Sequence, residues 1–206
     1  MNNFAEELTY WYFRLNGFFL LANYVLHDIE QGQQRGTADA DLLAIRFPHV
    51  YEEIGGQSKD WDKEKFSTWG FDIEKDNLAL IIEVKSGKEL KKDEIEKSFS
   101  LKRIETALCR FGIFPHEDVP RIHENLLEQK YVKESSWIIA KILVTERKIE
   151  GNWLNLSLDE IDKFIHKRIK SYLHDKYADR MYFPSILIQY IAWKDKKRKK
   201  YTEINT

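Results

Sequence analysis

The sequence is poor in residues that cross-link or break a chain: it has one cysteine, four prolines and nine glycines in 206 residues. The single cysteine, Cys109, excludes an intramolecular disulfide and a cysteine-rich zinc site, and it fits a reducing compartment. Because Cys109 lies in a segment with helical periodicity, we expect it to fill the core.

Long apolar runs are missing as well. The longest, from Gly17 to Leu26, contains Asn23 and is about half the ~20 residues that a membrane span needs. The first seven residues are acidic, where a secretory signal would carry Lys or Arg. We therefore expect a cytoplasmic protein with no membrane partner.

Neither sign of charge is in excess, since 33 basic residues balance 34 acidic ones. The net charge therefore gives no indication of a nucleic-acid partner. The sequence does have material for a core, with 43% hydrophobic residues, and 33% charged residues for a solvated surface. A chain of this length can hold one sizeable domain, whereas two domains would each be small. We predict one soluble globular domain over 1–206.

Hydrophobic periodicity predicts a mixed α/β chain. Asn3 precedes a helical apolar stripe and is a candidate N-cap, and Ser157 with Glu160 resembles a capping box. In chain order, the predicted elements are a helix over 4–16, a strand over 18–26, a turn over 27–36, strands over 38–46 and 78–85, a long helix over 89–110, a strand over 137–144, and helices over 158–175 and 184–193.

About thirty residues separate the strand that ends at Arg46 from the next strand. Connections this long are uncommon unless they are functional, so we expect a short helix near 62–69 and a role in covering a site. Trp61 and Trp69 of this insertion are candidates for stacking on unpaired bases. The remaining tryptophans in periodic apolar segments are expected in the core: Trp11, Trp137 and Trp193.

Two short strings place charge inside apolar strands. Side chains alternate between the faces of a strand, so Asp39 shares a face with Asp41, and Glu83 shares a face with Lys85. Burying such charges costs several kcal/mol each unless they are paired or bind a metal. If the two strands are neighbours, these charges converge on one candidate site.

The converging residues suit metal-dependent hydrolysis of a phosphodiester, because a divalent cation activates water and neutralises charge on the phosphorus oxygens. Magnesium prefers oxygen ligands and is typically held by one or two carboxylates. We assign Asp41 and Glu83 as ligands of Mg²⁺ (or Mn²⁺), with the Val84 carbonyl as a third protein ligand. Lys85 would orient or deprotonate the attacking water and stabilise the transition state.

Four features follow one another along the chain: a helix with a Glu, a strand with an Asp, a strand that ends in Glu-x-Lys, and a long helix. This combination resembles the PD-(D/E)xK nuclease superfamily, which includes Holliday junction resolvases and restriction endonucleases. The likeness covers residues 4–145 and departs from the signature at Ala40, where the name-giving motif has proline. It implies a restriction endonuclease-like core, in which helices flank a mixed central β-sheet, with extra C-terminal helices over 155–194 and a basic tail over 194–206. It implies DNA as the partner and leaves a homodimer open.

The same resemblance implies a catalytic glutamate in the first helix, eleven residues before a glycine that precedes the next strand. Counting back from Gly17 gives Glu6. On a helical wheel, however, Glu6 lies opposite the apolar stripe, whereas Glu7 borders it. Both carboxylates therefore stay candidates, with Glu6 slightly favoured.

Weaker candidates surround this constellation. Asp39 and His27 are more often a turn or surface residue than a ligand, and Ser86 is a candidate phosphate contact. Charges at helical spacing usually mark a solvated face, so Lys102 and Arg103 are weak phosphate contacts. The run from Lys194 to Lys200 has six basic residues in seven and is the better candidate for a salt-sensitive phosphate anchor.

Two rival interpretations remain open. One is a catalytically inactive nucleic-acid-binding module on the same fold, and the other is an interaction protein whose strand charges are coincidental, because Glu-x-Lys at the end of an edge strand is common. Metal-dependent cleavage distinguishes the nuclease from the first rival, and metal binding that needs Asp41 distinguishes it from the second.

Overall fold

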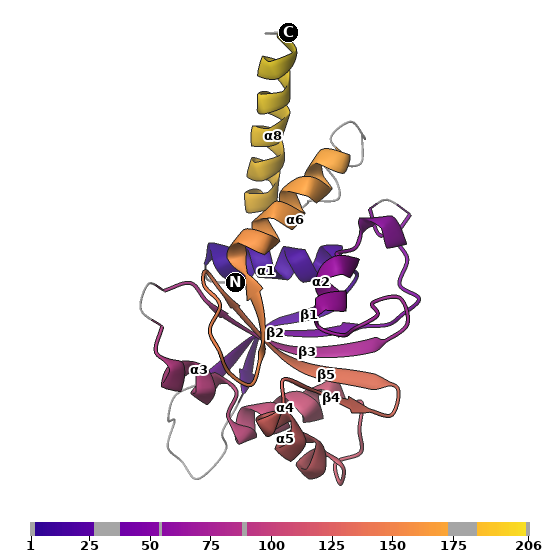
Figure 1. Cartoon of the computed structure of the whole chain (residues 1–206), viewed down its shortest axis with the longest axis vertical. Coiled ribbons are helices and arrows are strands. Elements are labelled where there is room, and N and C mark those ends of the chain that lie inside the picture. Colours follow the sequence, from indigo (N-terminus) through magenta and orange to yellow (C-terminus); the bar gives the residue numbers. More distant parts are fainter. Residues whose placement is uncertain (1–2, 27–37, 54, 88–89, 173–184, 205–206) are drawn as a thin grey trace.

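The computed structural model describes residues 3–26, 38–53, 55–87, 90–172 and 185–204 (Figure 1). The predicted turn over 27–36 and the candidate His27 lie outside the described residues. The elements are α1 (Phe4–Leu15), β1 (Phe19–Leu26), β2 (Ala38–Arg46), the 3₁₀ helix η1 (Ser58–Asp60), α2 (Lys63–Thr68), β3 (Asn77–Lys85), α3 (Lys92–Ser98), α4 (Leu101–Phe111), α5 (Val119–Glu128), β4 (Tyr131–Glu134), β5 (Trp137–Thr145), β6 (Leu154–Ser157), α6 (Leu158–Ser171) and α8 (Ile186–Ile204).

The described strands form one mixed six-stranded sheet in the order β1-β2-β3-β5-β4, with β6 also paired to β5. β1, β2 and β3 form an antiparallel meander, and β3 then pairs in parallel with β5. β4 and β6 share the outer edge of β5, one along its first half and the other along its last residues. The expectation of an α/β chain with a mixed central sheet between helices is confirmed.

Helices cover both faces of the sheet. Figure 1 shows α1 and α6 on one side and α4 and α5 on the other. Because helices cover both faces, β3 and β5 are buried along nearly their whole length, and apolar side chains point from these strands to both sides of the sheet. Leu80 and Ile82 belong to the core beneath α1 and α6, whereas Ala79 and Ile81 belong to the core beneath α4 and α5.

The two helix caps predicted from the sequence are confirmed. Asn3 Oδ1 accepts hydrogen bonds from the N–H groups of Ala5 and Glu6 at the start of α1. Ser157 and Glu160 form the reciprocal capping box at the start of α6. Each cap satisfies backbone donors that a helix start otherwise leaves unpaired.

The long helix expected over 89–110 is wrong, because two helices occupy this segment. α3 ends at Ser98, and the extended backbone of Ser100 starts α4 in a new direction. The break lets Phe99 stack on Trp153, with ring centroids 5.9 Å apart. Four further elements were not predicted: η1, α5, β4 and β6. The two strands have four residues each, too few to show an alternating pattern.

The insertion between β2 and β3 does not cover the charged strand ends; it borders a separate hollow against α6. It contains the short helix expected near 62–69, but it lies at the other end of the sheet, where β2 ends and β3 begins. Its contacts reach the C-terminal half of α1 and the side of α6: Asp62 accepts from Tyr12, and Lys65 pairs with Glu160. Figure 1 shows α2 and α3 at opposite ends of the sheet.

The tryptophans divide differently from the expectation. Trp11 and Trp69 are buried, Trp61 and Trp137 are half-buried, and Trp193 is 52% exposed. Trp193 is therefore not a core residue; among the described side chains of α8, the hydrophobic ones that are buried are Ile188, Ile191 and Ala192. Cys109 is half-buried and packs against the edge of the core beneath α4.

The last helix is longer than expected. The prediction was a helix over 184–193 followed by a basic tail, whereas α8 continues to Ile204 and includes the basic run. Its C-terminal half projects from the body of the molecule (Figure 1). Among the described residues, no helix combines the length and hydropathy that crossing a membrane requires.

Candidate active site

The antiparallel register of β2 and β3 brings the predicted carboxylates together. Leu42 is opposite Ile82, so the next pair toward the start of β2 and the end of β3 is Asp41 and Glu83. Asp41 Oδ2 accepts a hydrogen bond of 2.7 Å from the N–H of Val84, which ties its side chain to the neighbouring strand. The expectation that the two charged strings lie on adjacent strands is confirmed.

Glu83 is held by two donors at one oxygen. Lys85 Nζ lies 2.5 Å from Glu83 Oε1, and the hydroxyl of Ser98 donates to the same oxygen at 2.7 Å. Glu83 and Ser98 are buried, whereas the side chain of Lys85 is 34% exposed. The lysine therefore neutralises a buried carboxylate while it still has access to solvent.

Asp41 is in a different electrostatic position. Burial, the charge of Glu83 and, as the smallest contribution, the charge of Glu6 together raise the pKa of Asp41 to about 7, against the opposing effects of the Val84 N–H and Lys85. One lysine thus does not fully compensate the carboxylates that converge here. A cation at this position would relieve their repulsion.

The two candidate glutamates of α1 have different surroundings. Glu6 is buried and close enough to affect the titration of Asp41, and its Oε1 accepts a hydrogen bond of 2.6 Å from Asn3 Nδ2. Glu7 instead accepts a hydrogen bond of 2.5 Å from the hydroxyl of Ser185 at the base of α8. The structure brings Glu6, and not Glu7, toward the β2–β3 site.

Two contributors gave no signal in the sequence. Ser98 looked like an interior residue of one long helix, and only the end of α3 beside β3 brings its hydroxyl to Glu83. Asn23 lies on β1 between the pairs Ala22–Leu42 and Tyr24–Ala40, so it flanks Asp41, and its φ is +51°. Left-handed backbone is uncommon inside a strand, and asparagine tolerates it better than most residues, so Asn23 marks an irregularity of β1 next to Asp41.

The other predicted residues are not gathered into this site. Asp39 belongs to β2 and its side chain lies outside the described residues, as do the side chains from Lys196 onward. Ser86 directly follows Lys85 and is half-buried, and Lys102 and Arg103 lie in the first turn of α4. Their phosphate contacts stay predictions.

The donor set fits magnesium better than zinc. Within the described ranges, no group of three or more His, Cys, Asp or Glu side chains is arranged to hold a metal. Two carboxylates with water are nevertheless a usual protein contribution to a magnesium site. The hydrogen bonds use Asp41 Oδ2 and Glu83 Oε1, so Asp41 Oδ1 and Glu83 Oε2 are the oxygens that we expect to bind the cation. The Val84 carbonyl stays a predicted third ligand.

Comparison of the chain with protein-family models, with curated proteins and with solved structures finds no match. The residues of this site are therefore the basis on which a function can be assigned to the protein.

Proposed function

We propose that this protein is a metal-dependent nuclease that hydrolyses phosphodiester bonds in DNA. The observation that carries the proposal is the convergence of Asp41, Glu83 and Lys85 at one end of the β2–β3 pair, with Glu6 nearby. Repair, recombination, restriction and defence against foreign DNA are the settings that the resemblance to PD-(D/E)xK nucleases suggests.

The order of elements supports a restriction endonuclease-like core. A helix, three antiparallel strands, a helical connection and a strand parallel to the third correspond to α1, β1 to β3, α3 with α4, and β5. The added helix α5, the strands β4 and β6, and the helices α6 and α8 would be elaborations of that core.

Each side chain has a separate part in the proposed reaction. Asp41 and Glu83 would hold Mg²⁺, which when bound activates water and neutralises charge on the phosphorus oxygens. Lys85, ion-paired with Glu83, would orient the attacking water and stabilise the negative charge of the transition state. Glu6 would assist from α1, and the Ser98 hydroxyl would hold Glu83 in place.

The first experiment is cleavage of single-stranded, duplex and branched DNA and of RNA with Mg²⁺ or Mn²⁺. We expect cleavage of at least one DNA substrate, its loss in EDTA and its loss in Lys85→Ala. Lys133→Ala, an exposed lysine on β4, is the matched control and should cleave like the unmodified protein.

The alternative is a catalytically inactive nucleic-acid-binding module on the same fold. It predicts no metal-dependent cleavage of any of these substrates, together with binding that is unchanged by Lys85→Ala. That pair of results would overturn the nuclease proposal.

A further inference from the structure

The helices α6 and α8 are joined by a buried polar contact. His166 Nδ1 of α6 lies 2.7 Å from Asp195 Oδ2 of α8, and His166 Nε2 lies 3.5 Å from Asp162. Asp195 is 3% exposed. A carboxylate buried this deeply is costly unless it is paired, so the contact fixes where α8 crosses α6.

Asp195 also explains an irregularity of the sequence. It is the one acidic residue in the run of seven from Lys194 to Lys200. The run therefore combines positive charge with a single buried anchor to the body of the protein. The five basic residues after Asp195 continue directly along α8.

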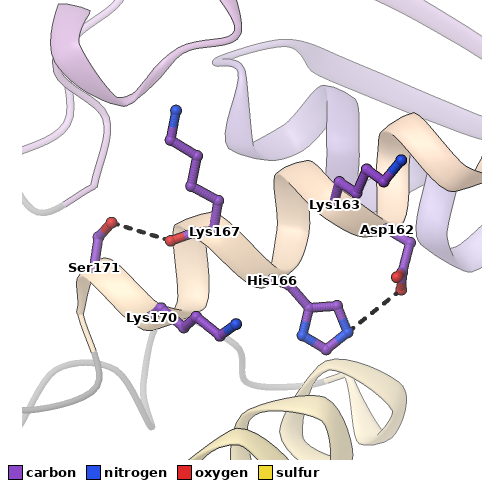
Figure 2. Close-up of a pocket in the computed structure, with 6 residues that line it drawn as sticks. All are labelled: Asp162, Lys163, His166, Lys167, Lys170 and Ser171. Atoms are coloured by element: carbon purple, nitrogen blue, oxygen red, sulfur yellow. Dashed lines mark hydrogen bonds and ion pairs between the residues drawn. The ribbon is translucent and has the colours of Figure 1, made fainter.

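The outer face of α6 adds positive charge on the other side of this anchor. An open hollow of about 600 Å³ is lined by residues of α6, which Figure 2 shows along the helix, with His166 directed toward α8 and Lys167 away from it: Asp162, Lys163, His166, Lys167, Lys170 and Ser171. Its three lysines are exposed and recur at helical spacing. Lys163 pairs with the exposed Asp159 at 2.5 Å, so part of its charge is already compensated.

We propose that α6 and α8 together form a nucleic-acid-binding surface whose geometry is set by the His166–Asp195 contact. The lysines of α6 and the basic run of α8 contact backbone phosphates, and the buried pair fixes where helix α8 crosses helix α6. The choice of nucleic acid as ligand rests on the proposed function.

Charge and surroundings argue for this ligand over two others. A second copy of the chain would bring a second basic run against the first, and like charges repel. An anionic membrane would need a broad apolar face beside the lysines, whereas the described part of α8, up to Asp195, exposes three large apolar side chains: Ile186, Tyr190 and Trp193. A phosphate backbone needs only spaced positive charges.

The test measures binding of labelled duplex and single-stranded DNA in EDTA, so that cleavage does not interfere. Asp195→Ala removes a negative charge, so net charge alone would tighten binding, whereas loss of the anchor should weaken it at least about fivefold. Asp195→Asn can still hydrogen-bond to His166 and should lie between Asp195→Ala and the unmodified protein. Asp159→Ala is the control for charge: it removes an exposed carboxylate from α6 and should bind as tightly as the unmodified protein or tighter.

A second set of variants tests the phosphate contacts with the anchor intact. Replacing Lys163, Lys167 and Lys170 together by Gln should weaken binding and reduce the slope of log affinity against log salt by about 2 to 3, because each phosphate contact contributes roughly 0.9. The same triple change at Lys130, Lys133 and Lys148 is the control. These lysines are exposed on or near β4 and at the end of β5, and their replacement should leave the slope nearly unchanged.

Several outcomes would overturn the inference. The first is DNA binding by a folded Asp195→Ala variant that is unchanged or tighter, and the second is no DNA binding by the unmodified protein. The third is an equal effect of the triple lysine replacement on α6 and the control triple replacement. The fourth is stronger binding to anionic vesicles than to DNA. If Asp195→Ala does not fold, His166→Asn and the α6 triple decide in the same way. If these variants behave as expected but no substrate is cleaved with Mg²⁺, the nuclease proposal fails and this inference stands.

Discussion

Both ends of the β2–β3 pair contain buried charge, but the charge is treated differently. At the end of β2, Arg46 is fully buried, and it donates to the backbone carbonyls of Asn16 at 2.9 Å and of Phe47 at 3.1 Å, and also to that of Ile73. Its guanidinium lies 4.3 Å from the ring centre of Trp61. At the start of β2, Asp41 faces another carboxylate.

The two buried charges differ in how well the surrounding protein compensates them. Burial lowers the pKa of Arg46 to about 10, which still leaves it cationic at neutral pH, and carbonyl oxygens from three segments compensate that charge. The pKa of Asp41 is raised to about 7, so its charge is only partly maintained in the absence of a cation. Arg46 ties the insertion to the sheet, whereas Asp41 and Glu83 keep a mutual repulsion that a bound cation would relieve.

The largest expected effect is on cleavage. Asp41→Asn should lower metal-dependent cleavage about a thousandfold or more, because a ligand and its charge are lost while the shape is kept. Its free energy of unfolding, measured in urea without metal, should stay the same or rise, because a buried carboxylate repelled by Glu83 is removed. A large loss of stability would instead make Asp41 a structural charge like Arg46.

The next effect is on stability at the opposite end. Arg46→Met should lower the free energy of unfolding by roughly 3 kcal/mol, because several buried carbonyls lose a charged donor. Arg46→Lys keeps the charge without the planar fork and should lose less. The measurement is urea unfolding, and Lys133→Ala is the surface control. A change below 0.5 kcal/mol in Arg46→Met would contradict the structural role.

The Ser98 hydroxyl positions Glu83, a proposed metal ligand, so removing this hydroxyl should affect the protein less than removing a ligand such as Asp41. Ser98→Ala should weaken Mn²⁺ binding about 10- to 100-fold, because residues that orient metal ligands typically contribute this much. Ser98→Thr keeps the hydroxyl and should restore much of the affinity. Ser100→Ala is the matched control, since the Ser100 side chain makes no capping hydrogen bond. Equal affinities for Ser98→Ala and Ser100→Ala would exclude the positioning role.

The smallest effect is a pH dependence. A proton on Asp41 competes with the cation, so Mn²⁺ affinity should fall by up to about tenfold per pH unit below pH 7 and level off above it. Calorimetric titration between pH 5.5 and 8.5 measures this slope, with Arg46→Lys as the control that should keep it. A profile that is flat across pH 7 would show that Asp41 does not bind the metal.

The central part of the site was predictable from the sequence. Asp41, Glu83 and Lys85 follow from alternation in two strands, because period-2 patterning assigns side chains to faces before any tertiary contact is known. Glu6 and Glu7 could not be separated in this way. A helical wheel reports the core side of α1, but the distance from Glu6 to Asp41 depends on how α1 lies across the sheet.

Other features depend on contacts between segments that are distant in sequence. The hydroxyl of Ser98 reaches Glu83 because the chain breaks at Phe99, and no local pattern signalled that break. His166 and Asp195 are 29 residues apart and meet only when α8 packs on α6. The location of the insertion could have been predicted from the sequence. It connects the last residue of β2 to the first residue of β3, and Asp41 and Glu83 lie at the opposite ends of these two strands.

The neighbouring glutamates of α1 have a consequence for how this chain can vary in length. Glu6 turns toward Asp41, and Glu7 binds Ser185 at the base of α8, so two consecutive residues connect one helix to two parts of the molecule. Consecutive residues differ by about 100° around a helix, so inserting one residue between Glu7 and Trp11 would rotate both carboxylates relative to the buried face that holds α1 in place. Proteins descended from a common ancestor with this one should therefore show no insertions or deletions across the first two turns of α1, even where the loops differ widely in length.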